Sequence, residues 1–161
     1  MTIKVGDRLP EATFRRMTAE GVKDVTTGEL FAGKKVVLFA VPGAFTPTCS
    51  AQHLPGYVAK ADAFKAKGID VVACVAVNDA FVLDAWAKAN DVGDKVLMLA
   101  DGNATFTKAI GLELDGTGRG LGIRSRRYAV VVEDGVVKDL RVDEVPGVVD
   151  ASGADAVLAA L

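Results

Sequence analysis

Two cysteines and a single histidine are the residues of this chain best suited to nucleophilic or metal chemistry. Cys49 ends the segment PGAFTPTC, which follows an apolar run that predicts a buried strand. Pro42 and Gly43 terminate this strand, and because Pro47 is a poor residue for a helix interior, the next helix begins only near Cys49. In a first helical turn, unpaired backbone N–H groups and the positive end of the helix dipole stabilise a thiolate. The sequence therefore favours Cys49 as a nucleophile.

His53 lies four residues after Cys49 and would share a helix face with it. This spacing suggests a cysteine–histidine nucleophile pair or half of a metal site. A cysteine hydrolase also needs a group that orients the histidine, and zinc usually takes four ligands, so we expect no metal site. Cys74 lies inside the apolar run VVACVAV, where a thiol is expected to be an inert packing residue because apolar surroundings disfavour the thiolate.

The apolar runs around these residues predict the elements that position them. KVVLFAV, residues 35–41, and DVVACVAV, residues 70–77, are continuous and rich in Val, as in strands of a parallel sheet that is covered on both faces. A helical pattern over residues 48–67, closed by Gly68, connects them as a βαβ unit. Ligand sites of open α/β sheets lie outside the carboxyl ends of the strands, where Cys49 falls.

A second crossover follows the first. Asn78 and Asp79 predict the start of a helix, and residues 96–100 predict a short strand after it. The predicted apolar face of that helix consists of Phe81, Val82, Ala85 and Trp86. The Gly-rich segment GTGRGLG lacks the Gly-Lys-Ser or Gly-Lys-Thr of a phosphate loop, so we predict a mobile loop before the strand of Arg124.

The chain is expected to end in an antiparallel hairpin and a helix. Residues 128–132 and 136–142 flank an Asp-Gly pair, which is typical of a tight hairpin turn, and the Ala-rich residues 151–161 predict the helix. No repeat, linker or charge block divides the sequence, so we predict one domain over residues 1–161. An α/β core with a central mixed β-sheet flanked by helices has the layout of a thioredoxin-like fold.

Composition excludes several classes of function. The 161 residues include 19 Lys and Arg against 21 Asp and Glu, a balance that does not suit a nucleic-acid binder. The mean hydropathy is +0.29, but every apolar run is far shorter than the ~18 residues that a membrane span needs. The opening residues MTIKVGDRLPEATF show no secretory signal, and two cysteines do not form a disulfide framework, so we expect reduced thiols and a cytoplasmic location.

The motif around Cys49 resembles that of the peroxiredoxins. PGAFTPTCS contains their Pro-x-x-x-Thr-x-x-Cys pattern, and KVGDRLP, VPGAFTPTCSAQHLPG, VVACVAVNDAFV and RYAVVVEDG are similar to the peroxiredoxin-5 subfamily. The resemblance runs over nearly the whole chain and implies a thioredoxin-like fold without a cofactor. It also implies a thiol peroxidase that reduces hydrogen peroxide and organic hydroperoxides through a Cys49 sulfenic acid.

The resemblance assigns roles to five residues besides Cys49. Pro42 would shield the thiolate, and Thr46 would exchange hydrogen bonds with the peroxide. Arg127 would hold the thiolate and polarise the O–O bond, which suits a guanidinium because it stays protonated. Taken singly, Thr46 could be a turn residue and Arg127 a surface charge. His53 and Gly43 would line the pocket.

The run Arg124-Ser125-Arg126-Arg127 contains three candidate cations. Alternate side chains of a strand point to opposite faces, so Arg126 and Arg127 cannot both reach the site. The resemblance selects Arg127, and Arg124 is less certain.

Some members of the subfamily resolve the sulfenic acid with a second cysteine near the C-terminus, and VDEVPGVVDASGADA contains none. The chain therefore resembles the one-cysteine members, which are recycled by glutathione and glutaredoxin or, in some cases, by thioredoxin. Family habit also implies a homodimer. Two alternatives remain. The first is a disulfide oxidoreductase or binding module with the same fold, but a disulfide exchanger would favour Cys-x-x-Cys, and this chain has Thr-Pro-Thr-Cys. The second is a non-enzymatic redox sensor.

Overall fold

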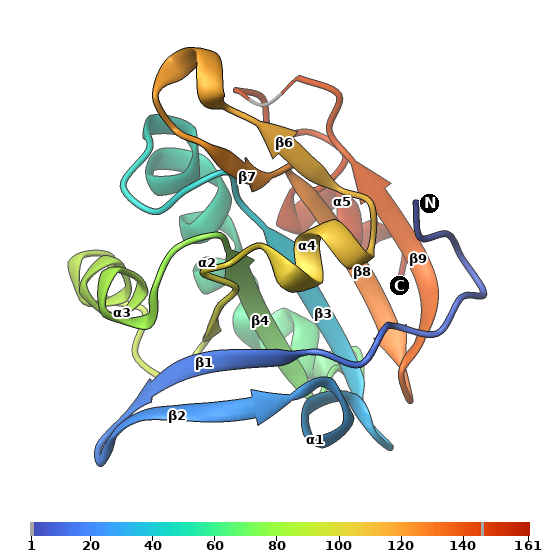
Figure 1. The fold of residues 1–161 in the computed structure, drawn as a ribbon. Helices are drawn as coiled ribbons and strands as arrows, with labels where there is room; N and C mark the ends of the chain where they lie inside the picture. Colours follow the sequence, from blue (N-terminus) through green and yellow to red (C-terminus); the bar gives the residue numbers. More distant parts are fainter. Residues whose placement is uncertain (1, 146) are drawn as a thin grey trace.

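A seven-stranded sheet forms the centre of the computed structural model, which describes residues 2–145 and 147–161 (Figure 1). Its strand order is β2-β1-β5-β4-β3-β8-β9, in which β3, β4 and β5 are parallel and the outer pairs are antiparallel. The sheet is mixed, as predicted. Its strands are β1 (Thr13–Thr18), β2 (Gly21–Thr26), β3 (Lys35–Ala40), β4 (Val71–Ala76), β5 (Leu97–Ala100), β8 (Tyr128–Glu133) and β9 (Val136–Val142).

The two Val-rich runs are the central parallel strands β3 and β4, which confirms the predicted βαβ unit. Both strands are buried on both faces because helices pack on each side of the sheet. One face carries α2 (Leu54–Ala66), α3 (Ala80–Ala89) and α5 (Ala154–Ala159), and the other carries α1 (Thr27–Phe31) and α4 (Thr105–Ala109) (Figure 1). Among the described residues, no helix has the length and apolar character that crossing a membrane requires.

The helix after β3 begins differently from the prediction. In place of one regular helix from residue 48, a single wide π-helical turn, η1 (Cys49–His53), precedes α2. Pro55 supplies the physical reason, because in a regular helix its ring would meet the carbonyl of the residue four positions earlier. The Leu54 amide instead donates to the Cys49 carbonyl, five residues back. Such turns are frequent at functional sites.

The predicted apolar face of α3 is wrong in part. The carboxylate of Asp79 accepts a hydrogen bond from the Val82 amide (2.8 Å), which fixes the start of the helix as predicted. From this start, Leu83 and Trp86 point to the sheet and are buried, whereas Phe81 is rotated away and 68% exposed. The first apolar residue of a helical pattern therefore need not lie on its buried face.

Three further segments depart from the prediction. The Gly-rich segment is a loop with a short 3-10 turn, Thr117–Arg119, before the predicted strand of Arg124, β7 (Ile123–Ser125), but the antiparallel partner of that strand, β6 (Glu113–Asp115), was not predicted. The N-terminal β1–β2 hairpin is an element that the prediction lacks, and its strands are largely half-exposed and carry charges. The last helix begins three residues late, because residues 150–153 form a turn.

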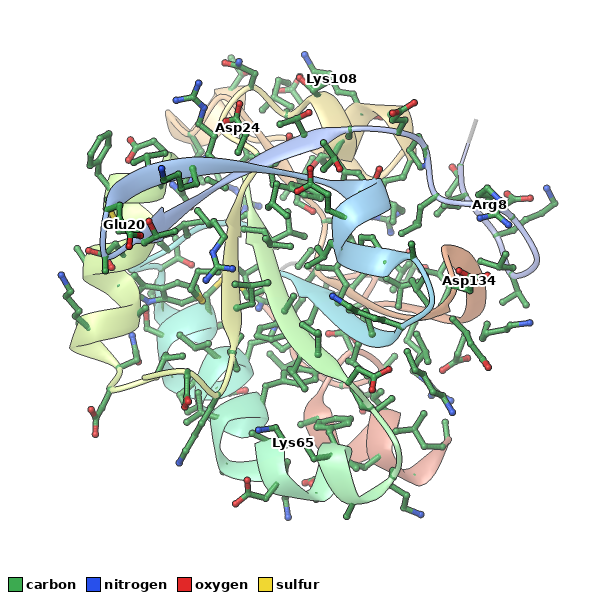
Figure 2. All side chains as sticks on the ribbon, turned by 90° about the horizontal axis from the view of Figure 1, so that it is seen from below. Arg8, Glu20, Asp24, Lys65, Lys108 and Asp134 are labelled. Atoms are coloured by element: carbon green, nitrogen blue, oxygen red, sulfur yellow. The ribbon has the colours of Figure 1, made fainter. Side chains whose placement is uncertain are left out.

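The β8–β9 hairpin turns through Asp134 and Gly135, as predicted, and both residues have positive φ (50° and 79°). The Asp134 carboxylate accepts a hydrogen bond from the Gly33 amide (2.7 Å), and its carbonyl accepts one from Arg8 (3.2 Å). Figure 2 shows Arg8 beside Asp134, where the N-terminal segment runs along this hairpin. The turn thus ties the N-terminal segment and the start of β3 to the far edge of the sheet.

Candidate active site

The Cys49 side chain is completely buried at the start of η1, just beyond the carboxyl end of β3. Pro42 and Gly43 end the strand and are also buried. The Trp86 indole of α3 donates to the Ser50 hydroxyl (2.9 Å), which anchors the turn beside the cysteine. The thiol thus lies where the sequence places it, in a first turn at the ligand end of the sheet.

Arg127 is the cation that contacts the thiol. Ala40, the last residue of β3, pairs with Tyr128, so the residue before Tyr128 arrives at the end of β3. Arg127 Nη2 donates to Cys49 Sγ at 3.2 Å, and the arginine is only 2% exposed. Arg126 points outward and forms an ion pair with Glu144 (3.2 Å). The two residues form the link between β7 and β8, and their side chains point in opposite directions, so only Arg127 reaches the thiol.

His53 is buried and lies on the other side of the guanidinium. Arg127 Nη1 is 2.9 Å from His53 Nδ1, and because a guanidinium only donates, Nδ1 is the acceptor. The ring proton is therefore assigned to Nε2, which donates to the Ser152 carbonyl (3.1 Å). His53 is thus a neutral acceptor for Arg127, and its Nδ1 is not free to take a proton from the thiol.

The pKa of His53 is lowered to about 4. Burial is the main cause, because it disfavours the charged imidazolium, and the neighbouring Arg127 cation adds to it. A hydrogen bond to the Ser152 carbonyl and the charge of Asp143 oppose these effects only in part. At neutral pH the ring is accordingly uncharged, which is the state that the hydrogen bond from Arg127 requires.

The turn before α5 completes the site, and no motif in the sequence indicates this role. The Tyr57 hydroxyl of α2 donates to the Ser152 carbonyl (2.6 Å), and the Tyr57 ring stacks on Phe39 of β3 with 4.0 Å between ring centroids. Ser152 is 99 residues from His53 along the chain, and nothing in its sequence context indicates a partner. Only the docking of the C-terminal segment brings these groups together.

Thr46 and Gly43 form the rim on the other side of Cys49. The Thr46 hydroxyl donates to the Gly43 carbonyl (2.6 Å), and the Ala44 amide donates to the side chain of Asn78 (2.9 Å). Asn78 therefore ties down this loop, and its predicted share in capping α3 is wrong. No contact between Thr46 and Cys49 is among the hydrogen bonds that the structure gives for the described residues.

Arg124 also reaches the rim, although it does not touch the thiol in any described contact. Its Nη1 donates to the Pro42 carbonyl (3.3 Å) and its Nε to the Leu121 carbonyl (3.0 Å). A Cβ on Gly43 would fall on Arg124 Nη1, so the glycine leaves room for this guanidinium. Arg124 thereby fastens the β6–β7 hairpin to the end of β3.

Cys74 lies on the same face of the sheet as Cys49 but within β4. It is fully buried, and both thiols are free. Burial raises the pKa of the Cys74 thiol, and the nearby charge of Cys49 raises it further. The structure thus places Cys74 as a packing residue, consistent with the prediction.

The arrangement suits a buried cysteine nucleophile whose negative charge is balanced by one guanidinium. Because the Cys49 side chain is inaccessible to water in this conformation, a substrate reaches the sulfur only when the rim moves. Within residues 2–145 and 147–161, no three His, Cys, Asp or Glu side chains gather as a metal site. The group that the site presents to a substrate is the Cys49 sulfur, with Arg127 beside it.

Comparisons with known proteins identify this class of site. The model of the Redoxin family matches residues 4–158. The chain is 52% identical to Arabidopsis thaliana peroxiredoxin-2E over 96% of this chain and 68% of the relative, and 54% identical to rice peroxiredoxin-2E-2 over 99% and 73%. It superposes on reduced Prx3 from Vibrio vulnificus in complex with hydrogen peroxide with a TM-score of 0.94, at 55% identity and 99% coverage of both chains.

The fold and the buried cysteine therefore define a redoxin with a thioredoxin-like fold. Within this class, the chain belongs to the peroxiredoxin family, whose members are thiol peroxidases that act in antioxidant defence. The predicted fold class and the predicted type of enzyme are both confirmed.

The predicted cytoplasmic location is wrong. The Arabidopsis and rice relatives are both named as chloroplastic. The prediction failed because cysteine usage distinguishes reducing from oxidising compartments and does not distinguish one reducing compartment from another.

Because His53 is neutral in the folded state, stability should fall as the pH decreases from its ordinary pKa of 6.5 toward about 4. The unfolded chain binds a proton in this range and the folded chain does not, so the free energy of unfolding should drop by about 2 kcal/mol between pH 7.5 and pH 5. The measurement is urea unfolding at both pH values for the wild type and for His53→Gln. The substitution should remove this part of the pH dependence, and an equal loss in both proteins would contradict the assignment.

Proposed function

We propose that Cys49 is the peroxidatic cysteine and that it reduces hydrogen peroxide and organic hydroperoxides. The thiolate attacks the terminal oxygen of ROOH, the S–O bond forms as the O–O bond breaks, and the leaving oxygen takes a proton to give water or an alcohol. Cys49 is left as a sulfenic acid. The observation that supports this proposal is the 3.2 Å hydrogen bond from Arg127 Nη2 to Cys49 Sγ inside a buried site.

Arg127 is proposed to act twice in this reaction. Its permanent charge favours the thiolate in the resting enzyme, and it stabilises the charge that develops on the departing oxygen. Burial strengthens both effects, because the electrostatic interaction is less screened in a site from which water is excluded.

The remaining roles are proposals for the rim and walls of the pocket. The Thr46 hydroxyl, three residues before Cys49, would exchange hydrogen bonds with the peroxide once its bond to the Gly43 carbonyl is given up or shared. Pro42 would shield the thiolate from water, and its burial supports this role. Gly43 and His53 would form walls of the pocket.

Hydrogen peroxide is the substrate with the most direct support. Prx3 from Vibrio vulnificus, which is 55% identical to this chain, has been crystallised in its reduced form in complex with this molecule. The complete burial of Cys49 also favours a small substrate over a bulky hydroperoxide.

We further propose that the enzyme is of the one-cysteine type in the peroxiredoxin-5 subfamily, recycled by an external thiol. The chain has no cysteine after Cys74. A Cys49–Cys74 disulfide would require β4, a central strand, to open in each cycle, which is a costly local unfolding. Glutathione would attack the sulfenic acid to form a mixed disulfide and water. Glutaredoxin would then reduce this mixed disulfide and restore the Cys49 thiol, with thioredoxin as the less favoured reductant.

A homodimer is proposed from the surface beside the site. Phe45 and Phe81 are 57% and 68% exposed, and they lie on neighbouring segments that the hydrogen bond from the Ala44 amide to Asn78 ties together. Two exposed phenylalanines on adjoining segments form an apolar surface that a second copy of the chain would cover.

Cys49→Ser should abolish peroxide reduction, a loss of at least about 10³-fold, because no other thiolate is available. Cys74→Ser should keep activity within about twofold, because its thiol is a packing group. Peroxide consumption with glutathione and glutaredoxin measures both. A folded Cys74→Ser protein as inactive as Cys49→Ser would require a resolving role for Cys74.

Intact mass after one equivalent of peroxide, followed by glutathione, tests the proposed recycling. We expect a single glutathione adduct, absent in Cys49→Ser and retained in Cys74→Ser. A loss of two hydrogens without an adduct would indicate a Cys49–Cys74 disulfide and contradict the one-cysteine mechanism. The adduct is then treated with glutaredoxin or with thioredoxin, each with its own reducing system, and the rates at which the two proteins release glutathione are compared.

Sedimentation equilibrium tests the dimer. The wild type should sediment at twice the chain mass, and Phe81→Ser should shift it to the monomer because it removes exposed apolar area from the contact. Val5→Ser, a substitution of a residue that is 58% exposed in the N-terminal segment, serves as the control and should leave the dimer intact. A monomeric wild type would refute the proposal.

A further inference from the structure

A buried carboxylate organises the turn before α5. Asp143 follows β9, is 6% exposed, and its amide donates to the Arg127 carbonyl (2.9 Å). Its carboxylate accepts hydrogen bonds from the amides of Asp150 (3.3 Å), Ala151 (2.8 Å) and Ser152 (3.3 Å), and from the Ser152 hydroxyl. These donors on one carboxylate fix the backbone of the turn.

The fixed turn determines where the Ser152 carbonyl lies. This oxygen accepts hydrogen bonds from the Tyr57 hydroxyl (2.6 Å) and from His53 Nε2 (3.1 Å). Because a carbonyl only accepts, it favours the tautomer of His53 with the proton on Nε2. The lone pair of Nδ1 then faces Arg127 Nη1, whereas the other tautomer would set an N–H against an N–H.

We propose that Asp143 is a positioning residue for Cys49. By holding the Ser152 carbonyl in place, it sets the tautomer of His53, and His53 in turn holds Arg127 Nη2 on the sulfur. This inference rests on the function proposed above. Asp143 itself has no described contact with the sulfur, so its effect passes through the hydrogen bonds that link the turn to the guanidinium.

Asp143→Asn tests the inference, because it keeps the size of the side chain and places an amide donor against the amides of the turn. His53 is the only histidine of the chain, so long-range ¹H–¹⁵N spectra of the imidazole report its tautomer without ambiguity. We expect the Nε2–H tautomer to lose its dominance and the thiolate absorbance of Cys49 to appear at higher pH. The rate constant for hydrogen peroxide should fall about tenfold, less than the ~10²-fold that a 1 Å misplacement of a catalytic group can cost, because Asp143 acts through other residues.

Two further variants make the test specific. Asp139→Asn, on β9, removes a carboxylate that pairs with Arg141 at the surface (2.8 Å), and it should leave all three measurements unchanged. Ser152→Ala removes the hydroxyl, with its hydrogen bond to Asp143 and its 3.3 Å contact with His53 Nε2, and keeps the carbonyl. This variant should shift the same three measurements in the same direction by a smaller amount. If Asp143→Asn does not fold, Ser152→Ala replaces it in the test.

A double-mutant comparison separates positioning from general stability. In a His53→Gln background, Asp143→Asn should cause no additional change in the thiolate titration, because the link through which it acts is already removed. The proposal is overturned if Asp143→Asn lowers the melting temperature but leaves the tautomer and the titration at their wild-type values. It is also overturned if the two substitutions are additive. A wild type without peroxide turnover would refute the proposed function alone, since the tautomer and the titration still decide the role of Asp143.

Discussion

The hydrogen bond between Arg127 and Cys49 is the interaction on which the rest of the site depends. A guanidinium that is 2% exposed has lost almost all of its hydration, and such a charge is tolerated only where partners replace the water. The sulfur and the His53 ring supply two of these partners. The surrounding structure must therefore position a thiol and a neutral imidazole around the buried guanidinium of Arg127.

Each element meets part of this requirement. The antiparallel pairing of β8 with β3 brings the arginine to the ligand end of the sheet, and the wide turn η1 brings both Cys49 and His53 toward it. Phe39 packs against the rings of His53 and Tyr57, so the central strand also supports the histidine.

The sequence was sufficient where a single local pattern decides the structure. Continuous Val-rich runs predicted β3 and β4, the Asp-Gly pair predicted the β8–β9 turn, and Pro42 and Gly43 predicted the position of Cys49. The family motif selected Arg127, and the structure places its guanidinium on the Cys49 sulfur and pairs Arg126 with Glu144, although the two residues lie between β7 and β8 rather than within a strand.

The prediction failed where structure depends on contacts between distant segments. The β1–β2 hairpin and β6 carry many charges and little apolar periodicity, so only their partners reveal them as strands. The face of α3 depends on how the helix docks, which is why Phe81 was misplaced. The link from Asp143 through Ser152 to His53 joins segments up to 99 residues apart, and neither the carboxylate nor the serine belongs to a recognisable motif.

The balance of charge explains why the histidine is not the base that its spacing first suggested. A cysteine–histidine pair needs a ring that accepts the thiol proton, and the product is an imidazolium. Here Nδ1 already accepts a hydrogen bond from Arg127, and the pKa of His53 is lowered to about 4 by burial and by that same cation. A second positive charge beside the guanidinium would be repelled by it and would lose its hydration on burial, and the charge of Asp143 offsets these effects only in part. In the proposed mechanism one fixed cation therefore serves one sulfur, and the imidazole aims the cation rather than carrying charge.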